Sequence, residues 1–452
     1  MPGPLIDLLV PLAGAALVVA AGTLLLRRSP RLALVVWLVV LCFVPVWAGS
    51  DLGLPQEPQV AATLGLLVAL LSLRGSLPVR LTVVDLLVMG FVVSALLPVL
   101  TGWGTSRELD VLVLRWAGAY ALGRVVGRRV RPEHVYTAVA VCFTVVAALT
   151  LLEWLTDWNP FLLVPGEGPL ADTWAWIQER GGVARAEGAF GHSIALGGSL
   201  ALAVPMVLVS PLRVPVRMAM VVLLGAASAV TFSRIGLGTL TLGLLLVVVF
   251  LRTGLSRRMR ALVAGGLVAG AAAAAPLVST VFEAAGDEAT GSADYRSDLL
   301  DLLGQVRPLG LSPSYFLAAT GESSFGTFRS IDNALLLAGL NYGWIPLLFV
   351  LAALAVAVGA VLRRRATAAT IAVVAQLPAL GTVALITQYA SWLWFVAGLA
   401  VATQVLATAG RPDGDLREDA PGPVPEERRE PSLLVGSRGE IGRRGHYRSD
   451  EA

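Results

Sequence analysis

A short stretch of the sequence, residues 185–193, gathers side chains that bind phosphate and move protons. It reads Arg-Ala-Glu-Gly-Ala-Phe-Gly-His-Ser and stands directly before an apolar run. Arginine offers planar, permanently charged donors that suit phosphate oxygens, while Glu187 and His192 can polarise a hydroxyl. We therefore predict that Arg185 binds a pyrophosphate and that Glu187 and His192 take part in catalysis. The alternative is a polar loop that caps the next helix, with Ser193 as N-cap.

Two further arginines interrupt apolar runs. Arg234 follows Ser233 between two such runs, and Arg115 lies within another. A charge at membrane depth is costly and usually faces the protein interior or a water-filled cavity, so both are candidate binding residues. Snorkelling toward the headgroups is the alternative for Arg234, and both interpretations stay open for Arg115. Arg124, near the other end of the run that holds Arg115, is interpreted as a snorkelling anchor.

The long polar segment 281–333 supplies the remaining candidates. It contains Arg296 and ends in Asp332-Asn333, where the next apolar run begins. A helix dipole favours a charged carboxylate at this place, and a general base for a sugar hydroxyl would sit there naturally. We predict that Asp332 is catalytic, that Asn333 belongs to the same site, and that Arg296 binds phosphate. N-capping is the alternative role of Asp332.

These residues belong to a chain whose overall composition is very apolar. Of its 452 residues 56% are hydrophobic and 14% charged, and the mean hydropathy is +0.76, far too apolar for an ordinary soluble domain. Because hydrocarbon offers backbone groups no partners, each span must be a helix of about 20 residues. The sequence predicts an all-α polytopic membrane protein with about 12–13 transmembrane helices. The predicted spans are 4–26, 32–48, 59–73, 82–100, 110–127, 135–155, 192–210, 217–232, 235–251, 261–280, 334–360, 369–387 and 391–408.

Arginines predict the side on which each connection lies. Every odd-numbered connection is basic, as in residues 27–31, 74–80, 128–131 and 363–365, and the even-numbered connections are not. Basic connections are retained in the cytoplasm, so the N-terminus and the segments 156–191 and 281–333 are expected outside. Leucines between charges over 293–306 predict an amphipathic helix along the interface. Residues 1–410 are thus expected to form one multi-span domain, followed by a disordered cytoplasmic tail over 411–452.

Several classes of protein are excluded by the composition. The sequence contains no lysine, which excludes the Lys-bearing phosphate loop of ATP-driven enzymes. Cys42 and Cys142 lie in predicted spans, and of the histidines only His192 is expected outside, so neither a disulfide framework nor a metal site is predicted. The Asp413-Gly-Asp415 motif lies in the predicted tail and is discounted. We expect no cofactor, no metal and no nucleic-acid partner.

In their order along the chain, these motifs resemble the O-antigen ligase and O-antigen polymerase (Wzy-type) superfamily of membrane glycosyltransferases. The residues that carry the resemblance are Asp85, Glu153 and Trp154, Asn159 and Pro160, Arg185 with Gly188 and Phe190, Ser233 and Arg234, Arg296, and Asp332 and Asn333 with Gly339 and Gly343. Ligases of this family typically carry histidine where this chain has Asp332. That difference favours a polymerase, or transfer to another acceptor, over ligation to a lipid core.

The resemblance implies a GT-C-like enzyme of cell-surface polysaccharide biosynthesis, located in the cytoplasmic membrane with its site on the outer face. Its donor would be a glycan linked to undecaprenyl or another polyprenyl pyrophosphate, and its acceptor a glycan or other hydroxyl. A carboxylate, Asp332 or Glu187, would take the acceptor's proton. The arginines that would bind the leaving pyrophosphate are Arg185, Arg234, Arg296 and Arg115.

Other envelope polysaccharide assembly proteins are expected as partners of such an enzyme. The main alternative is a flippase or exporter of lipid-linked oligosaccharide, which would be expected to show paired halves. A non-catalytic scaffold for envelope assembly is the third possibility. The sequence shows no internal repeat, and its polar residues are concentrated on the side predicted to be outside, so we favour the enzyme.

Overall fold

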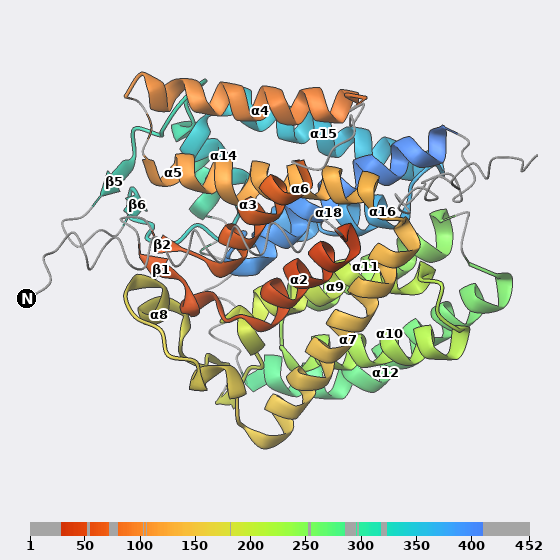
Figure 1. Ribbon diagram of the computed structural model, residues 1–452. Coiled ribbons are helices and arrows are strands. Elements are labelled where there is room, and N and C mark those ends of the chain that lie inside the picture. The colour runs from red at the N-terminus through yellow and green to blue at the C-terminus, as the bar shows by residue number, and fades with distance from the viewer. Residues whose placement is uncertain are drawn as a thin grey trace, which may run out of the picture. The chain divides into compact units, whose positions relative to one another are not determined.

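The computed structural model describes residues 29–51, 55–71, 80–102, 104, 106–180, 182–251, 255–284, 295, 298–317 and 323–409. Within these ranges the chain is mostly helical, and its strands form short two-stranded antiparallel sheets (Figure 1). The chain divides into two compact units, 1–416 and 417–452, and every described residue belongs to the first. The predicted first span, 4–26, and the predicted tail, 411–452, lie outside the described residues.

Most of the predicted spans correspond to one helix each. These helices are α2 (Pro30–Phe43), α3 (Pro58–Leu71), α4 (Val83–Leu100), α7 (Pro132–Thr156), α9 (Ser193–Val209), α10 (Val214–Val230), α11 (Arg234–Phe250), α12 (Arg257–Ala284) and α18 (Thr387–Thr408). The short connecting elements are η1 (Val46–Ala48), β1 (Ser50–Asp51), β2 (Pro55–Gln56), α5 (Ser106–Asp110), η3 (Pro160–Leu163), α8 (Pro169–Trp174), β3 (Glu179–Arg180), β4 (Val183–Ala184), η4 (Gly188–Phe190), η5 (Asp301–Gln305), β5 (Tyr315–Leu317) and β6 (Ser323–Phe325).

Four helices of the described ranges are long and apolar enough to cross a membrane, namely α4, α7, α18 and α15 (Trp344–Leu362). Shorter apolar helices accompany them, and α9, α10 and α11 have 17 residues each, at the lower end of the length that spans a bilayer. This composition is that expected of an all-α membrane protein. Helices α4 and α15 expose much of their apolar surface, as lipid-facing helices do.

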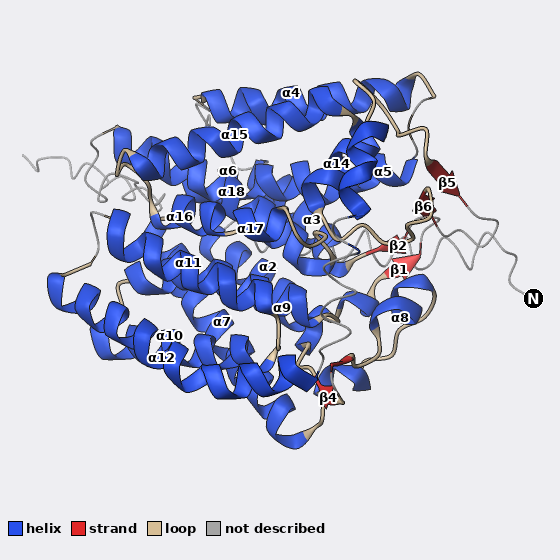
Figure 2. Cartoon of the chain, turned by 180° about the vertical axis from the view of Figure 1, so that it is seen from behind, coloured by secondary structure: helices blue, strands red, loops and turns tan. Residues whose placement is uncertain are grey.

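Helix α9 lies at the centre of the described helices, because α7, α10, α11, α16 (Ala368–Ala375) and α18 all pack against it (Figures 1 and 2). Every residue from Ala195 to Leu208 is buried. A helix that is apolar on all sides avoids water, and here the surrounding helices cover it. Beside it, Trp392 of α18 contacts the rings of Trp37 and Phe143, with centroids 6.3 and 5.0 Å away.

Helices α6 (Gly118–Arg129) and α18 cross at unusually short range. A Cβ atom added at Gly123 would overlap the carbonyl oxygen of Phe395 and lie 2.9 Å from the Leu399 nitrogen. The same holds in the other direction, since a Cβ at Gly398 would lie 3.0 Å from the Arg124 nitrogen. Only glycine lets two helix backbones come this close.

The predicted span 334–360 is wrong as a single helix. The chain forms α14 (Ala334–Tyr342), breaks at Gly343 and continues as α15. Gly343 has φ +99°, and a Cβ there would lie 2.7 Å from the Leu309 Cα, so the break requires glycine. Carbonyl groups of the preceding loop satisfy the new helix start, because Trp344 N–H donates to Arg307 O at 2.8 Å.

The predicted span 369–387 is also not one helix. It forms α16 (Ala368–Ala375) and the single turn α17 (Leu377–Leu380), and the chain is then non-helical until α18 begins at Thr387. Pro378 limits the continuation of α16, since it lacks an N–H group. Gln376, at the break, accepts a hydrogen bond from the Tyr389 hydroxyl at 2.7 Å. Non-helical backbone at such depth is tolerated where protein groups cover it.

Two other predicted helices differ in detail. The predicted span 110–127 begins as a π-helix, η2 (Val111–Ala117), before α6 continues it. Of the predicted amphipathic helix 293–306, the described part is mainly the 3-10 helix η5. Its leucines are buried on one side only, with Leu299 and Leu302 packed against Leu336 and Leu340 of α14. The apolar face of this segment is therefore directed at α14.

Candidate functional site

The segment 185–193 is buried among the helix ends. The Arg185 side chain is 7% exposed, and its Nε donates to the Thr231 carbonyl oxygen at 3.0 Å, which ties the segment to the turn between α10 and α11. Glu187 is 1% exposed, and its Oε1 accepts from the Gln178 N–H at 3.3 Å. The structure thus places Arg185 and Glu187 in one cluster, with both beneath the surface.

Residues of α7, of α18 and of the N-cap position of η3 hold this segment in place. The carboxylate of Glu153 accepts from the backbone N–H groups of Glu187 and Gly188, at 3.1 and 2.9 Å. Asn159 donates to the Gly188 carbonyl at 3.2 Å, and Gln388 donates to the Ala189 carbonyl at 2.8 Å. Glu153 and Asn159 are therefore positioning residues that fix the backbone of this segment. The sequence analysis had named them only as motif residues of the resemblance.

Burial decides the ionisation of Glu187. Loss of solvent, reinforced by the negative charge of Glu153 and opposed by the Gln178 hydrogen bond and the positive charge of Arg185, raises the pKa of Glu187 to about 8. The carboxyl group is thus mainly protonated at neutral pH. A protonated and buried carboxyl group is a poor acceptor for a proton from an incoming hydroxyl.

His192 is the N-cap of α9. Its Nδ1 accepts a hydrogen bond from the Ile194 N–H at 3.1 Å, so the capping residue is His192 and the expectation that Ser193 is the cap is wrong by one position. Burial and the charge of Arg185 lower the pKa of His192 to about 4, which makes the ring neutral near pH 7. Because Nδ1 accepts, the ring proton lies on Nε2, and the ring is a hydrogen-bond donor toward any other partner.

Ser233 and Arg234 begin α11. Ser233 is the N-cap, with its hydroxyl oxygen accepting from the Gly236 N–H at 3.0 Å. Ser233 itself is buried, whereas Arg234 is exposed. The turn before them is anchored by Thr231, whose carbonyl also receives the Arg185 bond. Of the predicted arginines on described elements, Arg234 is thus the one most open to a ligand, and Arg296 lies outside the described residues.

Asp332 and Asn333 precede α14. Asn333 is the N-cap, since its Oδ1 accepts from the Leu336 N–H at 2.9 Å, and Asp332 is not. Asp332 is partly exposed and accepts from the Ser330 hydroxyl at 3.2 Å. Its charge adds to the effect of burial in raising the pKa of Tyr295 nearby. Asp332 is therefore a carboxylate accessible from outside the protein, unlike Glu187.

Arg115 stands apart from these residues. It forms an ion pair with Glu57, and its Nε lies 3.7 Å from Asp110 Oδ2. Glu57 is 2% exposed and also accepts from the side-chain amide of Gln59. Because carboxylates already neutralise its charge, Arg115 is a weak anion binder. Sequence reasoning missed Glu57, which lies 58 positions away.

Arg124 is not a snorkelling anchor, contrary to expectation. It is 6% exposed, and its Nε and Nη2 both donate to the carboxylate of Asp85 at 2.8 Å. The Tyr120 hydroxyl donates to the same carboxylate at 2.8 Å. Asp85 also completes a capping box with Thr82 at the start of α4. This bidentate pair joins α4 to α6.

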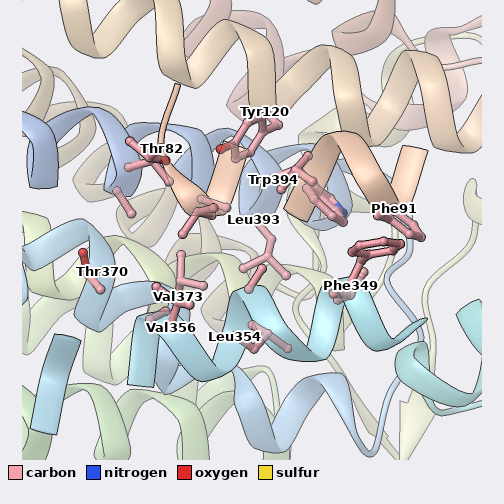
Figure 3. Close-up of a pocket in the computed structure, with 18 of the residues that line it drawn as sticks. Thr82, Phe91, Tyr120, Phe349, Leu354, Val356, Thr370, Val373, Leu393 and Trp394 are labelled. Carbon is pink, nitrogen blue, oxygen red and sulfur yellow. The ribbon is translucent and has the colours of Figure 1, made fainter. Parts of the chain in front are cut away.

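An apolar groove of about 310 Å³ lies between α4, α6, α14, α15, α16 and α18 (Figure 3). Thr82 and Thr370 lie toward one end, Phe91 and Phe349 toward the other, and Tyr120, Leu393 and Trp394 between them. On α18 the lining extends from Leu393 to Thr408, about 22 Å at the rise of an α-helix. Ala334 and Leu335, the first residues of α14, also line it. No sequence pattern predicted this groove, since its walls come from eight separate elements, the six named above together with η2 and α17.

The predicted site residues thus fall into three places. Arg185, Glu187, His192 and Ser233 share one cluster around the Thr231 turn, and Arg234 lies beside it. Asp332 and Asn333 stand at the start of α14, and α17 contacts both α14 and α11. Arg115 belongs to the separate Glu57 cluster. Comparisons with protein-family models, with curated proteins and with solved structures find no match to this chain.

Proposed function

We propose that this protein is a membrane glycosyltransferase of the O-antigen polymerase or ligase kind, with a GT-C-like multi-pass fold. It would transfer or polymerise glycan from a polyprenyl-pyrophosphate donor on the outer face of the cytoplasmic membrane. The observation that carries the proposal is the apolar groove, one wall of which begins at Ala334, two residues after Asp332. A lipid-linked donor needs this combination of a long apolar channel with a polar head at its end.

The exposure of the side chains supports the roles proposed for them. Asp332 is the general base in this proposal, because an acceptor hydroxyl can reach it, whereas Glu187 is buried and mainly protonated. Arg234 binds the pyrophosphate, and Arg296 of the long loop is proposed to assist it. Arg185 and His192 then shape the site through the turn at Thr231 and the start of α9.

The proposed reaction is one displacement. The acceptor oxygen attacks the anomeric carbon, the bond from that carbon to the pyrophosphate oxygen breaks, and the hydroxyl proton passes to the Asp332 carboxylate. Negative charge develops on the leaving pyrophosphate, and the Arg234 guanidinium, with planar donors for phosphate oxygens, stabilises it there. The neutral Nε2–H of His192 is a further donor at the same end of the helices.

The distribution of arginines supports the proposed orientation. The connections after α6 and α15 contain Arg128, Arg129 and Arg131, and Arg363 to Arg365, and are therefore expected to be cytoplasmic. Asp332 and Arg234 precede helices that run toward that basic end. Both residues are thus expected at the outer surface, where the glycan of a flipped lipid-linked donor is found.

The test is turnover of polyprenyl-pyrophosphate-linked repeat units by the purified full-length protein. Wild type should produce longer glycan chains and free polyprenyl pyrophosphate, and Asp332→Asn and Arg234→Ala should each lose both products. Asp301→Asn and Arg307→Ala are matched controls, since both residues are exposed and lie in the same long loop. Movement of the lipid-linked glycan across liposome membranes without turnover would refute the transferase and identify a flippase.

A further inference from the structure

Residues 157–164, here called the η3 segment, present large apolar side chains on the protein surface directly after α7. Leu163 is 73% exposed and Trp158 is 49% exposed, and Leu162 and Val164 are exposed as well. The sequence predicted that this segment lies outside the membrane. An apolar surface of this kind in water is unusual and marks contact with a partner or with lipid.

Hydrogen bonds on its inner side hold the η3 segment in this conformation. Asn159 is buried, its amide donates to the Gly188 carbonyl at 3.2 Å, and its Oδ1 accepts from the Phe161 N–H at 2.9 Å. At the other end, the buried Trp47 ring donates to the Val164 carbonyl at 3.1 Å. Because the backbone is fixed at both ends, the exposure of Trp158 and Leu163 is a property of the fold.

The apolar surface of the η3 segment continues an apolar face of α7. Exposed apolar residues recur along this helix every three or four positions, so they share one face. They are Val141, Val145, Ala148, Leu152 and Leu155. Because α7 is long and apolar enough to cross a membrane, such a face is suited to lipid. The η3 segment extends this face beyond the end of the helix, since Trp158 follows Leu155 by three positions.

The length of α7 carries that face to the outer surface of the membrane. Its 25 residues span about 37 Å, against about 30 Å of hydrocarbon in a bilayer. The first turn is polar, with Glu133 and His134, whereas the last turn contains Trp154 and Leu155. The connection 128–131 before α7 is basic and expected in the cytoplasm, so the apolar last turn is at the outer interface.

We propose that the η3 segment lies in the outer interface of the lipid bilayer, with Trp158 and Leu163 inserted among the lipids. Interfacial segments of this kind insert their apolar side to a depth of about 5–10 Å. Tryptophan is suited to that depth, and the exposed carboxylates of Asp157 and Glu167 remain at the level of the headgroups. The continuity with α7 favours lipid over a partner protein, because lipid is the surrounding that both surfaces would share.

The inserted segment would also fix the depth of the buried cluster around Glu187. Asn159 follows Trp158 directly and holds the Gly188 carbonyl, while Glu153 of α7 holds the Glu187 and Gly188 N–H groups. One side of the chain thus contacts lipid and the other side holds the cluster. This inference does not depend on glycosyl transfer, because it requires only that α7 crosses a membrane in the expected orientation.

The experiment places an NBD fluorophore on the full-length protein in lipid nanodiscs, through Leu163→Cys. The native Cys42 and Cys142 are buried, so wild type supplies the labelling background. Brominated lipid should quench the probe at position 163, and aqueous iodide should quench it several-fold less than probes introduced by Glu167→Cys or Asp172→Cys. These two are matched controls, because both are exposed polar positions near the same segment. The probe introduced by Leu162→Cys should behave like that of Leu163→Cys.

Iodide quenching at position 163 equal to that of the two controls would place the segment in water and refute the proposal. Shielding from both quenchers would show that protein covers the segment, which would also refute it. In that case an oxidised dimer of Leu163→Cys would identify a second copy of the chain as the cover. Because no readout involves turnover, an inactive glycosyl transfer assay would leave these outcomes unchanged.

Discussion

Replacing Gly123 by alanine should loosen the contact between α6 and α18. The new methyl group would overlap the carbonyl oxygen of Phe395 and lie 2.9 Å from the Leu399 nitrogen, and both are backbone atoms that cannot rotate away. The two helices must therefore separate. Overpacking of a close contact costs about 1–3 kcal/mol, and sometimes more. The better helix propensity of alanine returns about 1 kcal/mol, so the net effect is destabilising.

The assay is the apparent melting temperature of the detergent-purified protein, followed by tryptophan fluorescence. Gly225→Ala in α10 is the matched control, since nothing lies within 4 Å of the added Cβ. Only the higher helix propensity of alanine acts there, so the melting temperature of this variant should be unchanged or higher. Gly398→Ala tests the same contact from the other helix and should behave like Gly123→Ala. If Gly123→Ala melted together with the Gly225 control, the close crossing of α6 and α18 would be refuted.

Separation of these helices should also change the width of the apolar groove. Tyr120 of α6 and Trp394 of α18 line its middle (Figure 3), and each lies about one turn before the glycine of its own helix. Gly123→Ala should therefore widen the groove and weaken retention of a polyprenyl lipid, whereas the Gly225 control should not. The two measurements together distinguish a loss of packing from a loss of the proposed donor site.

Three other perturbations test how the charges are held. Glu153→Gln loses the charged acceptor shared by the Glu187 and Gly188 N–H groups, a loss of about 1.5–3 kcal/mol, and should lower the melting temperature. The pKa of Glu187 is about 8 in the folded protein against an ordinary 4.5, so the free energy of unfolding should decrease as the pH rises from about 4.5 to about 8. Glu187→Gln should make this decrease smaller. The lowered pKa of His192 acts only below pH 6.5, so melting curves above pH 6.5 isolate Glu187. Asp85→Asn leaves the buried Arg124 charge uncompensated and should cost about 3–5 kcal/mol, measured as earlier unfolding and faster proteolysis.

Local signals in the sequence located most helix ends. Ser233 and Asn333 are N-caps where the polar residues before apolar runs predicted helix starts. The break at Gly343 carried the same kind of signal, because a glycine with Pro346 just after it is typical of a helix end. Averaged hydropathy concealed it, since the apolar residues on its two sides form one continuous run. The single-helix expectation for 334–360 failed for that reason.

Nothing in the nearby sequence predicted which carboxylates would pair with the buried arginines. Asp85 and Arg124 are 39 positions apart, and Glu57 and Arg115 are 58 apart, yet each pair is in direct contact. The sequence predicted that an arginine within an apolar run is functional or snorkels. It did not allow for a third outcome, a buried carboxylate supplied by a distant segment of the chain, which is the one that the structure has at both arginines.

The sequence alone determined that this chain is apolar, helical and long enough in several runs to cross a membrane, because helix hydrogen bonds are local and depend on nearby residues. It also determined which polar residues flank those runs. Only the tertiary structure decided that Glu187 is buried while Asp332 and Arg234 stay accessible, and that eight elements enclose an apolar groove. The physical reason is that burial, and with it ionisation, depends on which distant helices pack together, and the composition of one segment does not specify its neighbours.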